Sequence, residues 1–288
     1  MTSLSKLQTS NEKTNQGGME GLIKLELEAD QNSKTFVKTL SSKPPLLIQK
    51  ALYPNQKLSN TAHIYIMSSA GGILQGDRLQ IDITAKKNTK THVTTQAATE
   101  IYKAENQLSF QKINISLENN SYLEFLPKQI IPHKFCNFDQ EVNLRIDENS
   151  TLVYSETISS GRIAYGEKFD FTSLFLRLNA YNQNENLLFS EAMKLEPLKR
   201  KEKFQSIFGS KNIYSTIYII SKSFNSEKLD HEIFSALQKQ STTASCSQLP
   251  HESGVIVRIL SDSIDDTFDL ISKIANIIRM KLQSNLNL

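Results

Sequence analysis

Side chains that could take part in chemistry gather in four short stretches of the chain, at residues 69–78, 94–99, 123–127 and 155–167. The first stretch holds three of the ten glycines, followed by Asp77. It lacks the Gly-Lys-Ser/Thr and Gly-x-Gly-x-x-Gly spacings with which loops bind phosphate. Gly71, Gly72 and Gly76 therefore predict a turn with positive φ at one of these positions. Asp77 would either hydrogen-bond the backbone N–H groups of this turn or face a polar cavity.

The second and third stretches offer hydrogen-bonding groups without an assembled catalytic set. Thr94, Thr95 and Gln96 are good donors and acceptors but lack a positioned base, so a hydrogen-bonded strand corner and a functional polar site both remain open. Glu124 lies between two apolar residues and is expected on the solvent side of a strand. Pro127 cannot donate a ladder hydrogen bond, so this strand should end or bend there.

The fourth stretch combines two acids, one arginine and two glycines. Glu156 and Glu167 flank Arg162, and Gly161 and Gly166 provide hinges on either side of it. An acid and an arginine in a partly buried loop form either a structural ion pair or a functional polar patch. The sequence leaves these two interpretations open.

Metal-binding and nucleophilic motifs are missing from the sequence. The chain has five His and two Cys, and His133 near Cys136 supplies only two soft ligands where a tight site needs more. No catalytic triad, Walker loop or dinucleotide fingerprint occurs. A carboxylate-dependent glycan hydrolase or lyase on a β-helix-like frame remains an alternative, because paired carboxylates can perform acid–base hydrolysis. A metal-independent adaptor built from β-repeats is a further alternative.

Composition sets aside several other classes of protein. The chain has 288 residues, 39% of them hydrophobic, and a formal net charge of +3, which is too weak to indicate nucleic acid as a partner. No apolar stretch approaches the length of roughly 18 residues that a membrane span needs. Residues 1–20 are polar without an apolar signal region, which predicts a disordered tail on a cytoplasmic protein. Residues 21–288 are expected to form a single domain.

Alternating apolar and polar residues predict a mainly β fold. The clearest cases are residues 22–27, 63–67, 79–83, 113–117, 142–146 and 174–178. Strands after three successive turns begin thirty residues apart, at 91–93, 121–123 and 151–153, with a looser fourth copy at 188–191. This period indicates a helical-β (β-helix-like) stack of strand-turn-strand units, although elongated antiparallel layers would also bury the apolar faces.

Two α-helices are expected near the C-terminus. Ser226 can cap a segment with Leu229, Ile233 and Leu237 at helical spacing. Ser263 can cap a second helix whose apolar positions cover much of its circumference. Residues 255–260, between the two helices, are expected to form a buried strand.

The same motifs, taken in order, carry a resemblance to a known family. Residues 69–77, 94–99, 123–127 and 161–167, followed by Leu249-Pro250 and residues 254–260, resemble the urease accessory protein UreD family, called UreH in some organisms. The similarity covers roughly residues 20–283. Gln75 stands where many relatives carry a glycine, and the chain has no Trp, which relatives often have in the last helix.

The resemblance implies a non-enzymatic maturation factor with a β-rich, helical-β fold. Proteins of this family form a complex with UreF and the GTPase UreG and contact apo-urease. The complex promotes GTP-dependent insertion of nickel into urease, with UreE commonly supplying the metal. A polar passage through the UreD-like protein is proposed to carry nickel, so no tightly bound cofactor is expected.

The four acids of the motifs are the candidates for such a passage. A conduit must release its ion, so oxygen ligands and water suit it better than a cage of Cys and His. Asp77, Glu124, Glu156 and Glu167 are therefore predicted to contact nickel transiently, with Asp77 favoured. The two C-terminal helices are the candidates for the UreF contact because the last one carries a broad apolar surface. Packing of that helix on its own sheet is the alternative.

Overall fold

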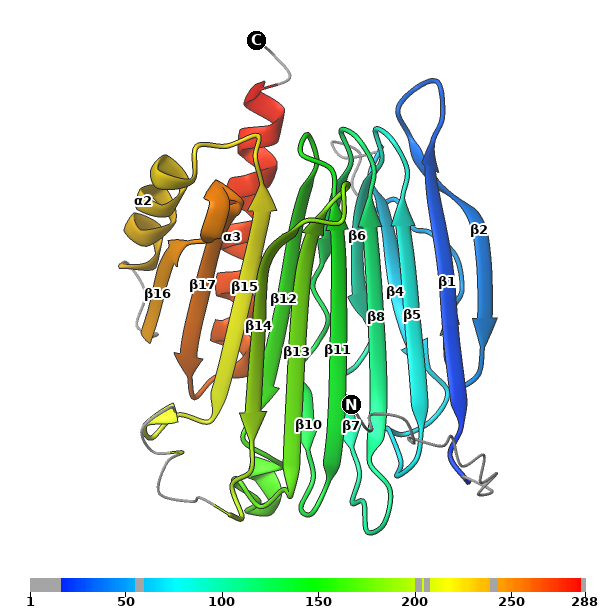
Figure 1. Cartoon of the computed structure of the whole chain (residues 1–288), viewed down its shortest axis with the longest axis vertical. Coiled ribbons are helices and arrows are strands. Elements are labelled where there is room, and N and C mark those ends of the chain that lie inside the picture. The colour runs from blue at the N-terminus through cyan, green and yellow to red at the C-terminus, as the bar shows by residue number, and fades with distance from the viewer. Residues whose placement is uncertain (1–16, 55–59, 200–203, 205–207, 239–242, 286–288) are drawn as a thin grey trace, which may run out of the picture.

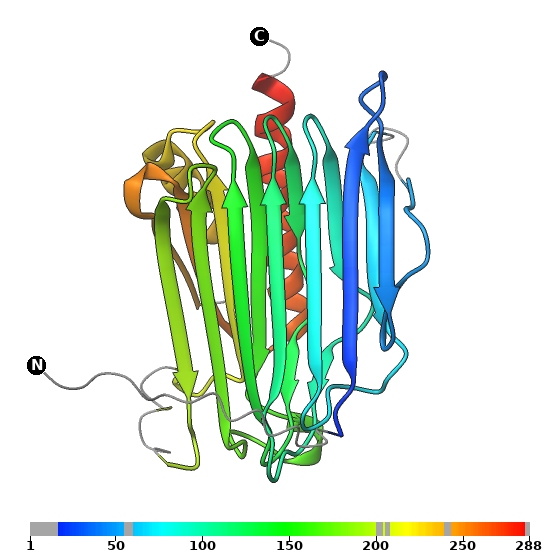
Figure 2. The same ribbon diagram turned by 45° about the vertical axis from the view of Figure 1, so that its right-hand side comes forward.

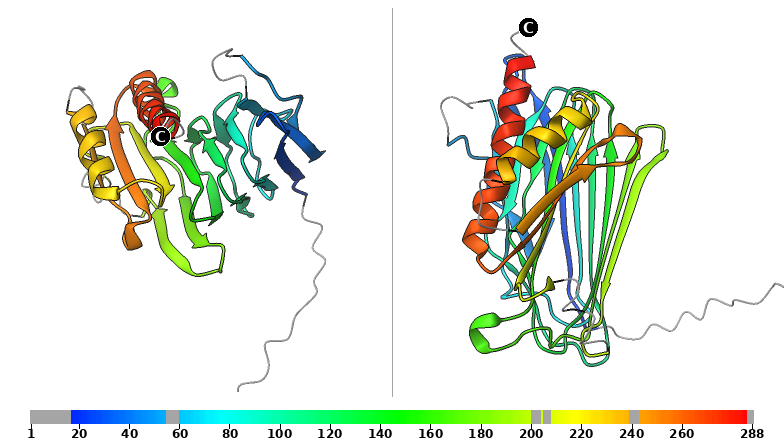
Figure 3. Two further views of the ribbon diagram at one scale, coloured as in Figure 1. Left: turned by 90° about the horizontal axis from the view of Figure 1, so that it is seen from above. Right: turned by 90° about the vertical axis from the view of Figure 1, so that its left-hand side faces the viewer.

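Two β-sheets lie face to face, and helices cover part of the outer face of one of them (Figures 1 and 3). The computed structural model describes residues 17–54, 60–199, 204, 208–238 and 243–285. The predicted tail at residues 1–20 lies largely outside the described residues. Within the described part, Glu20 already begins the first strand. No helix of the described residues is long and apolar enough to cross a membrane.

The first sheet has seven strands, which lie side by side in Figure 2. Its order is β14 (Leu187–Leu195), β13 (Ser173–Asn182), β11 (Asn137–Ile146), β8 (Ser109–Leu117), β5 (Arg78–Ala85), β1 (Glu20–Ala29) and β2 (Thr35–Lys43). The five central strands run parallel to one another, and the two edge strands are antiparallel to their neighbours.

The second sheet also has a parallel centre. Its main order is β16 (Thr243–Gln248), β17 (Gly254–Ser261), β15 (Ile213–Ser221), β12 (Thr151–Ser159), β9 (Tyr122–Phe125), β6 (Lys90–Thr95), β4 (Ala62–Ser68) and β3 (Leu46–Ile48). Two short strands, β7 (Thr99–Ile101) and β10 (Ile130–Pro132), pair beside this path. Strands β4, β6, β9 and β12 are parallel, whereas β15, β16 and β17 continue the sheet with antiparallel pairing.

The chain alternates between the two sheets from β4 to β13, so each turn of the stack adds one strand to each layer. Register partners Ile83, Ile115 and Leu144 in the first sheet follow at steps of 32 and 29 residues. Thr91, Leu123 and Leu152 in the second sheet follow at the same steps. The predicted β-helix-like stack of strand-turn-strand units is therefore confirmed. The alternative of elongated antiparallel layers is wrong for the central strands of both sheets, because these strands pair in parallel.

Two details of the predicted repeat are wrong. Thr91 pairs with Leu123 where the thirty-residue alignment placed Ser121, because the turns of successive coils differ in length. The proposed fourth copy at 188–191 lies in β14, which returns antiparallel to β13 in the first sheet. In the second sheet the strand that follows β12 is β15, which pairs antiparallel with it.

Side-chain alternation explains why these segments form strands. In β5, β8 and β11 every second residue is buried, and the apolar members of this set face the opposite sheet. The outer face of the first sheet is polar, and hydrogen bonds link register partners Asp82, Asn114 and Asn143 across three strands. A second apolar cluster fills the space between the outer face of the second sheet and the helices.

The two predicted helices are present as α2 (Ser226–Leu237) and α3 (Ile264–Asn285). The side chain of Asn225 accepts the capping hydrogen bond of α2 from Lys228, so Ser226 is the first helical residue and the predicted cap is wrong by one position. Ser263 caps α3 as predicted, because its hydroxyl accepts from the N–H of Asp266 at 3.1 Å. Both helices lie on the outer face of the second sheet (Figure 3).

Candidate functional site

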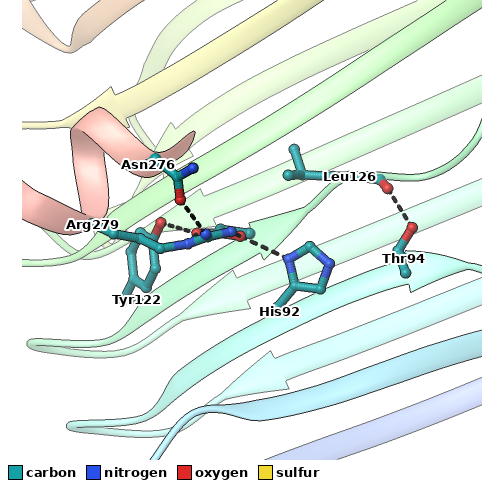
Figure 4. Close-up of polar contacts among 7 residues, drawn as sticks. His92, Thr94, Tyr122, Leu126, Asn276 and Arg279 are labelled. Carbon is teal, nitrogen blue, oxygen red and sulfur yellow. Dashed lines mark hydrogen bonds and ion pairs between the residues drawn. The ribbon is translucent and has the colours of Figure 1, made fainter. Parts of the chain in front are cut away.

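Glu124 lies at the centre of a buried polar cluster on the outer face of the second sheet, beneath α3. Its side chain is 1% exposed, which corrects the expectation that it faces solvent. His92 from the neighbouring strand lies 2.7 Å away, measured from its Nδ1 to the Oε2 of Glu124. Tyr122 and Arg279 donate to the same carboxylate. Figure 4 shows the side chains of Tyr122, Arg279 and His92 close together beside α3. Side chains from β6, β9 and α3 thus meet at the carboxylate of Glu124.

The charges around Glu124 determine its ionisation. Burial by itself raises the pKa of this carboxyl, but hydrogen bonds from His92 and Arg279 and the charge of Arg279 outweigh burial and lower the pKa to about 2. Glu124 is therefore ionised and paired at neutral pH. Arg279 in turn donates to the side-chain oxygen of Asn276 at 2.6 Å, which orients it along α3. The cluster fastens the last helix to the sheet.

Glu156 lies on the inner face of β12, between the two sheets. It lines a cavity of about 30 Å³ together with Gln111 and Gln140, which are register partners on the opposite sheet. A cavity of this size has room for a water molecule. Gln140 donates to the Glu156 carboxylate at 2.5 Å and the Tyr154 hydroxyl donates to it at 3.1 Å. Polar groups therefore interrupt the apolar space between the sheets at this point.

The pKa of Glu156 is raised to about 7. Burial is the main cause, hydrogen bonds from Tyr154 and Gln140 oppose it, and the negative charge of Glu191 adds to it. Glu191 lies on edge strand β14, where it accepts from Tyr218 at 3.0 Å and from Arg258 at 2.7 Å. The rings of Tyr154 and Tyr218 stack with centroids 5.9 Å apart. Polar groups thus lead from Glu156 to the edge of the stack.

Asp77 holds the glycine turn together. It is 2% exposed, and its two carboxylate oxygens accept from the backbone N–H groups of Met19 at 2.7 Å and Leu74 at 2.8 Å. Gly76 has a φ of 79°, which confirms the predicted positive-φ turn at one of the three glycines. Position 72 requires glycine for a different reason, because a Cβ there would lie 2.5 Å from the carbonyl oxygen of Glu100.

Arg162 and Glu167 form an ion pair across the loop that follows β12. Arg162 donates twice to the carboxylate, with Nε lying 2.9 Å from Oε2, and the N–H of Lys134 donates to the same oxygen. Gly166, at a φ of 75°, ends the short 3₁₀ helix Ile163–Tyr165 between the two partners. Gly161 also has a positive φ, at 145°. The ion pair that the sequence offered as one interpretation is therefore present in the structure.

The threonine stretch forms a hydrogen-bonded strand corner. The hydroxyl of Thr94 donates to the carbonyl of Leu126 at 2.6 Å, as drawn in Figure 4, and that of Thr95 donates to the carbonyl of Ala97 at 2.9 Å. The backbone N–H of Gln96 donates to the carbonyl of Ile66 in the neighbouring strand β4. Strand β9 ends at Phe125, two residues before Pro127, as predicted.

The side chains of His133 and Cys136 have different surroundings. His133 pairs with Glu100 at 2.8 Å, whereas Cys136 is fully buried and its thiol pKa is raised, chiefly by burial, to about 12. Across the part of the chain that the structure describes, no three His, Cys, Asp or Glu side chains are arranged to hold a metal ion.

Several residues of these clusters were not identified from the sequence. Arg279 is 155 residues from Glu124, and no local pattern connects them. His92 carries a recognisable signal, because it occupies the outer side of a predicted strand. Gln111 and Gln140 also carry one, since a glutamine at an inward position of an alternating strand is unusual.

The fold and its clusters define a class: a two-sheet β-solenoid whose motif acids brace loops, anchor a helix or line an internal cavity. The family model for the UreD urease accessory protein matches residues 19–287. Urease accessory protein UreD of Cenarchaeum symbiosum (strain A) is 32% identical over 266 residues, covering 92% of this chain and 93% of that protein. The chain belongs to the UreD family.

Other relatives agree with this membership. Urease accessory protein UreD 2 of Brucella suis biovar 1 (strain 1330) is 32% identical over 84% of this chain and 81% of its own length. Urease accessory protein UreD of Photorhabdus laumondii subsp. laumondii is 31% identical over 84% of this chain and 76% of its own length. The likeness therefore covers most of the chain in these relatives as well.

Proposed function

We propose that this chain is a cytoplasmic, non-catalytic maturation factor that helps to insert nickel into urease. It acts in a complex with UreF and the GTPase UreG, contacts apo-urease, and receives nickel that UreE brings to the complex. Membership of the UreD family over residues 19–287 is the observation that carries this proposal. The motif residues support it, because they are used in loop bracing and helix anchoring instead of forming a nucleophile–base pair.

The internal cavity supports a passage for the metal. Glu156 and the amides of Gln111 and Gln140 place oxygen ligands between the sheets, and such ligands hold divalent cations weakly enough for release. Complete dehydration of the ion would be very costly, so the ion keeps part of its water while these oxygens replace the rest. Glu191 at the edge of the stack, with its side chain 27% exposed, supplies a second carboxylate on the way out.

The four predicted acids differ in their fitness for this role. The carboxylates of Asp77, Glu124 and Glu167 accept from backbone N–H groups or from arginine, and these bonds brace a turn, anchor a helix or close an ion pair. Glu156 is bonded only by neutral side chains and faces a cavity that has room for water. The geometry thus favours Glu156 over Asp77 as a contact for nickel, and assigns Asp77 to loop bracing.

The helices supply the surface proposed for UreF. Ile271, Ile274 and Ile278 of α3 are nearly fully buried against the sheet, so the apolar breadth of this helix is used within the chain. Its outward residue Met280 is 70% exposed, and Phe234 of α2 is 42% exposed. These two side chains are the apolar contacts that we propose for UreF.

Urease activation in a host that carries the urease and accessory genes tests the passage. Glu156→Leu should reduce urease activity and its nickel content while the variant still assembles with UreF and UreG. Glu148→Gln, which changes an exposed turn carboxylate, is the matched control and should activate normally. Normal activation by Glu156→Leu would remove Glu156 from the path, and normal activation in the absence of the chain would refute the proposed function itself.

A further inference from the structure

A cavity of about 500 Å³ opens on the outer face of the second sheet, next to the Glu124 cluster. Its walls come from β4, β6 and β9, from turns at the ends of these strands and from the C-terminal part of α3. A volume of this size lies within the range of small-molecule sites. The cavity is separate from the one that Glu156 lines, because that one lies between the two sheets.

The charges around this cavity favour an anion. Glu124 is the one carboxylate of its lining, and it is buried and already paired with Arg279. Lys90 also lines the cavity, and its ammonium forms no ion pair with the residues that the structure describes. Since Glu124 and Arg279 compensate each other, the ammonium of Lys90 leaves the cavity with positive charge in excess.

Two polar atoms of the lining lack hydrogen-bond partners. Ser121 is 2% exposed and its hydroxyl oxygen is unpartnered, and the Nε2 atom of His63 is buried and unpartnered as well. Buried polar groups in folded proteins almost always have a partner, so such atoms at the wall of a cavity indicate a missing one. Asn88 and Asn120, which bond to each other at 2.7 Å, add amide groups to the same lining.

We propose that this cavity binds a small oxyanion, a phosphate or carboxylate group, with Lys90 as its charged contact and the hydroxyl of Ser121 as a hydrogen-bond donor. His63 donates from Nε2 in the tautomer that carries a proton there. A cation fits the site poorly, because Lys90 and Arg279 repel it and the donors around Glu124 already occupy that carboxylate. The site is independent of the proposed nickel passage.

Calorimetric titration of the purified full-length chain tests the proposal. Inorganic phosphate and succinate are titrated separately, each at constant ionic strength adjusted with sodium chloride so that general screening does not change. The wild-type chain should bind at least one of them with one site per chain. Binding of phosphate alone or succinate alone supports the site and identifies which oxyanion it takes.

Matched variants locate the binding. Lys90→Gln removes a charge-assisted hydrogen bond and should weaken binding about ten-fold or more, and Ser121→Ala should weaken it by about three-fold. Lys24→Gln changes an exposed lysine on the other sheet and should leave affinity unchanged. Circular dichroism confirms that each variant is folded. The proposal is overturned if neither anion binds the wild type, or if Lys90→Gln binds as tightly as Lys24→Gln.

Discussion

Replacing Arg279 with methionine removes the guanidinium that fastens α3 to Glu124 and keeps much of the aliphatic length. The magnitude follows from the carboxyl group, whose pKa falls from 4.5 in the unfolded chain to about 2 in the folded protein. At about 1.4 kcal/mol per pKa unit, such a shift corresponds to roughly 3 kcal/mol of stability at neutral pH, which His92 and Arg279 supply together. Since the variant leaves a buried carboxylate with fewer partners, we expect it to lose about 3 kcal/mol.

Urea unfolding at pH 7, followed by circular dichroism, measures this loss. The double variant Glu124→Gln with Arg279→Met removes both charges and should be less destabilised than Arg279→Met alone, by about 1 kcal/mol or more. Arg258→Met is the control, because its partner Glu191 lies at an edge and Arg258 is 48% exposed. That variant should lose less than about 1 kcal/mol.

The same measurement has a defined pH dependence. A carboxyl whose pKa is lowered on folding contributes stability above its unfolded value of 4.5 and loses this contribution as the pH falls toward 2. The difference between wild type and Arg279→Met should therefore shrink below pH 4.5. If Arg279→Met unfolds like the Arg258→Met control at pH 7, or if the double variant is destabilised as much as Arg279→Met alone, the reasoning is refuted.

Three further perturbations test the other clusters. Gly76→Ala places a residue with a Cβ at a φ of 79°, which disfavours it, and should lower the free energy of unfolding by about 1–2 kcal/mol in a thermal unfolding experiment. Gly71→Ala should lower it little, because the nearest atom to the new Cβ would be 3.4 Å away. Asp77→Asn weakens two charge-assisted hydrogen bonds, so amide exchange in residues 17–19 and 71–76 should accelerate; unchanged exchange would contradict the bracing role. The raised pKa of Glu156 costs stability as the pH rises from 4.5 to about 7, so Glu156→Gln should be about 3 kcal/mol more stable than wild type at pH 8 and equal to it near pH 4. A stability difference that does not change with pH would refute that pKa shift.

The β-solenoid could be predicted because its determinants are local. Alternation along residues 79–83, 113–117 and 142–146 fixes which side of each strand is buried, and repetition of the unit fixes the stacking. The register could not be predicted, since turns of unequal length shift Thr91 against Leu123. The reversal of direction after β13 is made locally, by a short turn in which the side chain of Asn182 accepts from the N–H groups of Asn184 and Asn186, and the thirty-residue repeat took no account of this turn.

In the candidate site, too, contacts between residues close in sequence could be predicted and contacts between distant residues could not. Arg162 and Glu167 lie five residues apart, so their pairing was among the interpretations that the sequence offered. The burial of Glu124 was missed because its main partner, Arg279, is supplied by a helix at the other end of the chain. Glu156 was identified as a candidate, but its distinction from Asp77 depends on which donors surround each carboxylate, and only the assembled sheets determine that.

The nickel content of urease purified from matched hosts with and without this chain tests the central claim most directly. We expect urease made without the chain to be deficient in nickel and activity, and expression of the chain with the other accessory proteins to restore both. Urease fully loaded with nickel in the absence of this chain would contradict the claim.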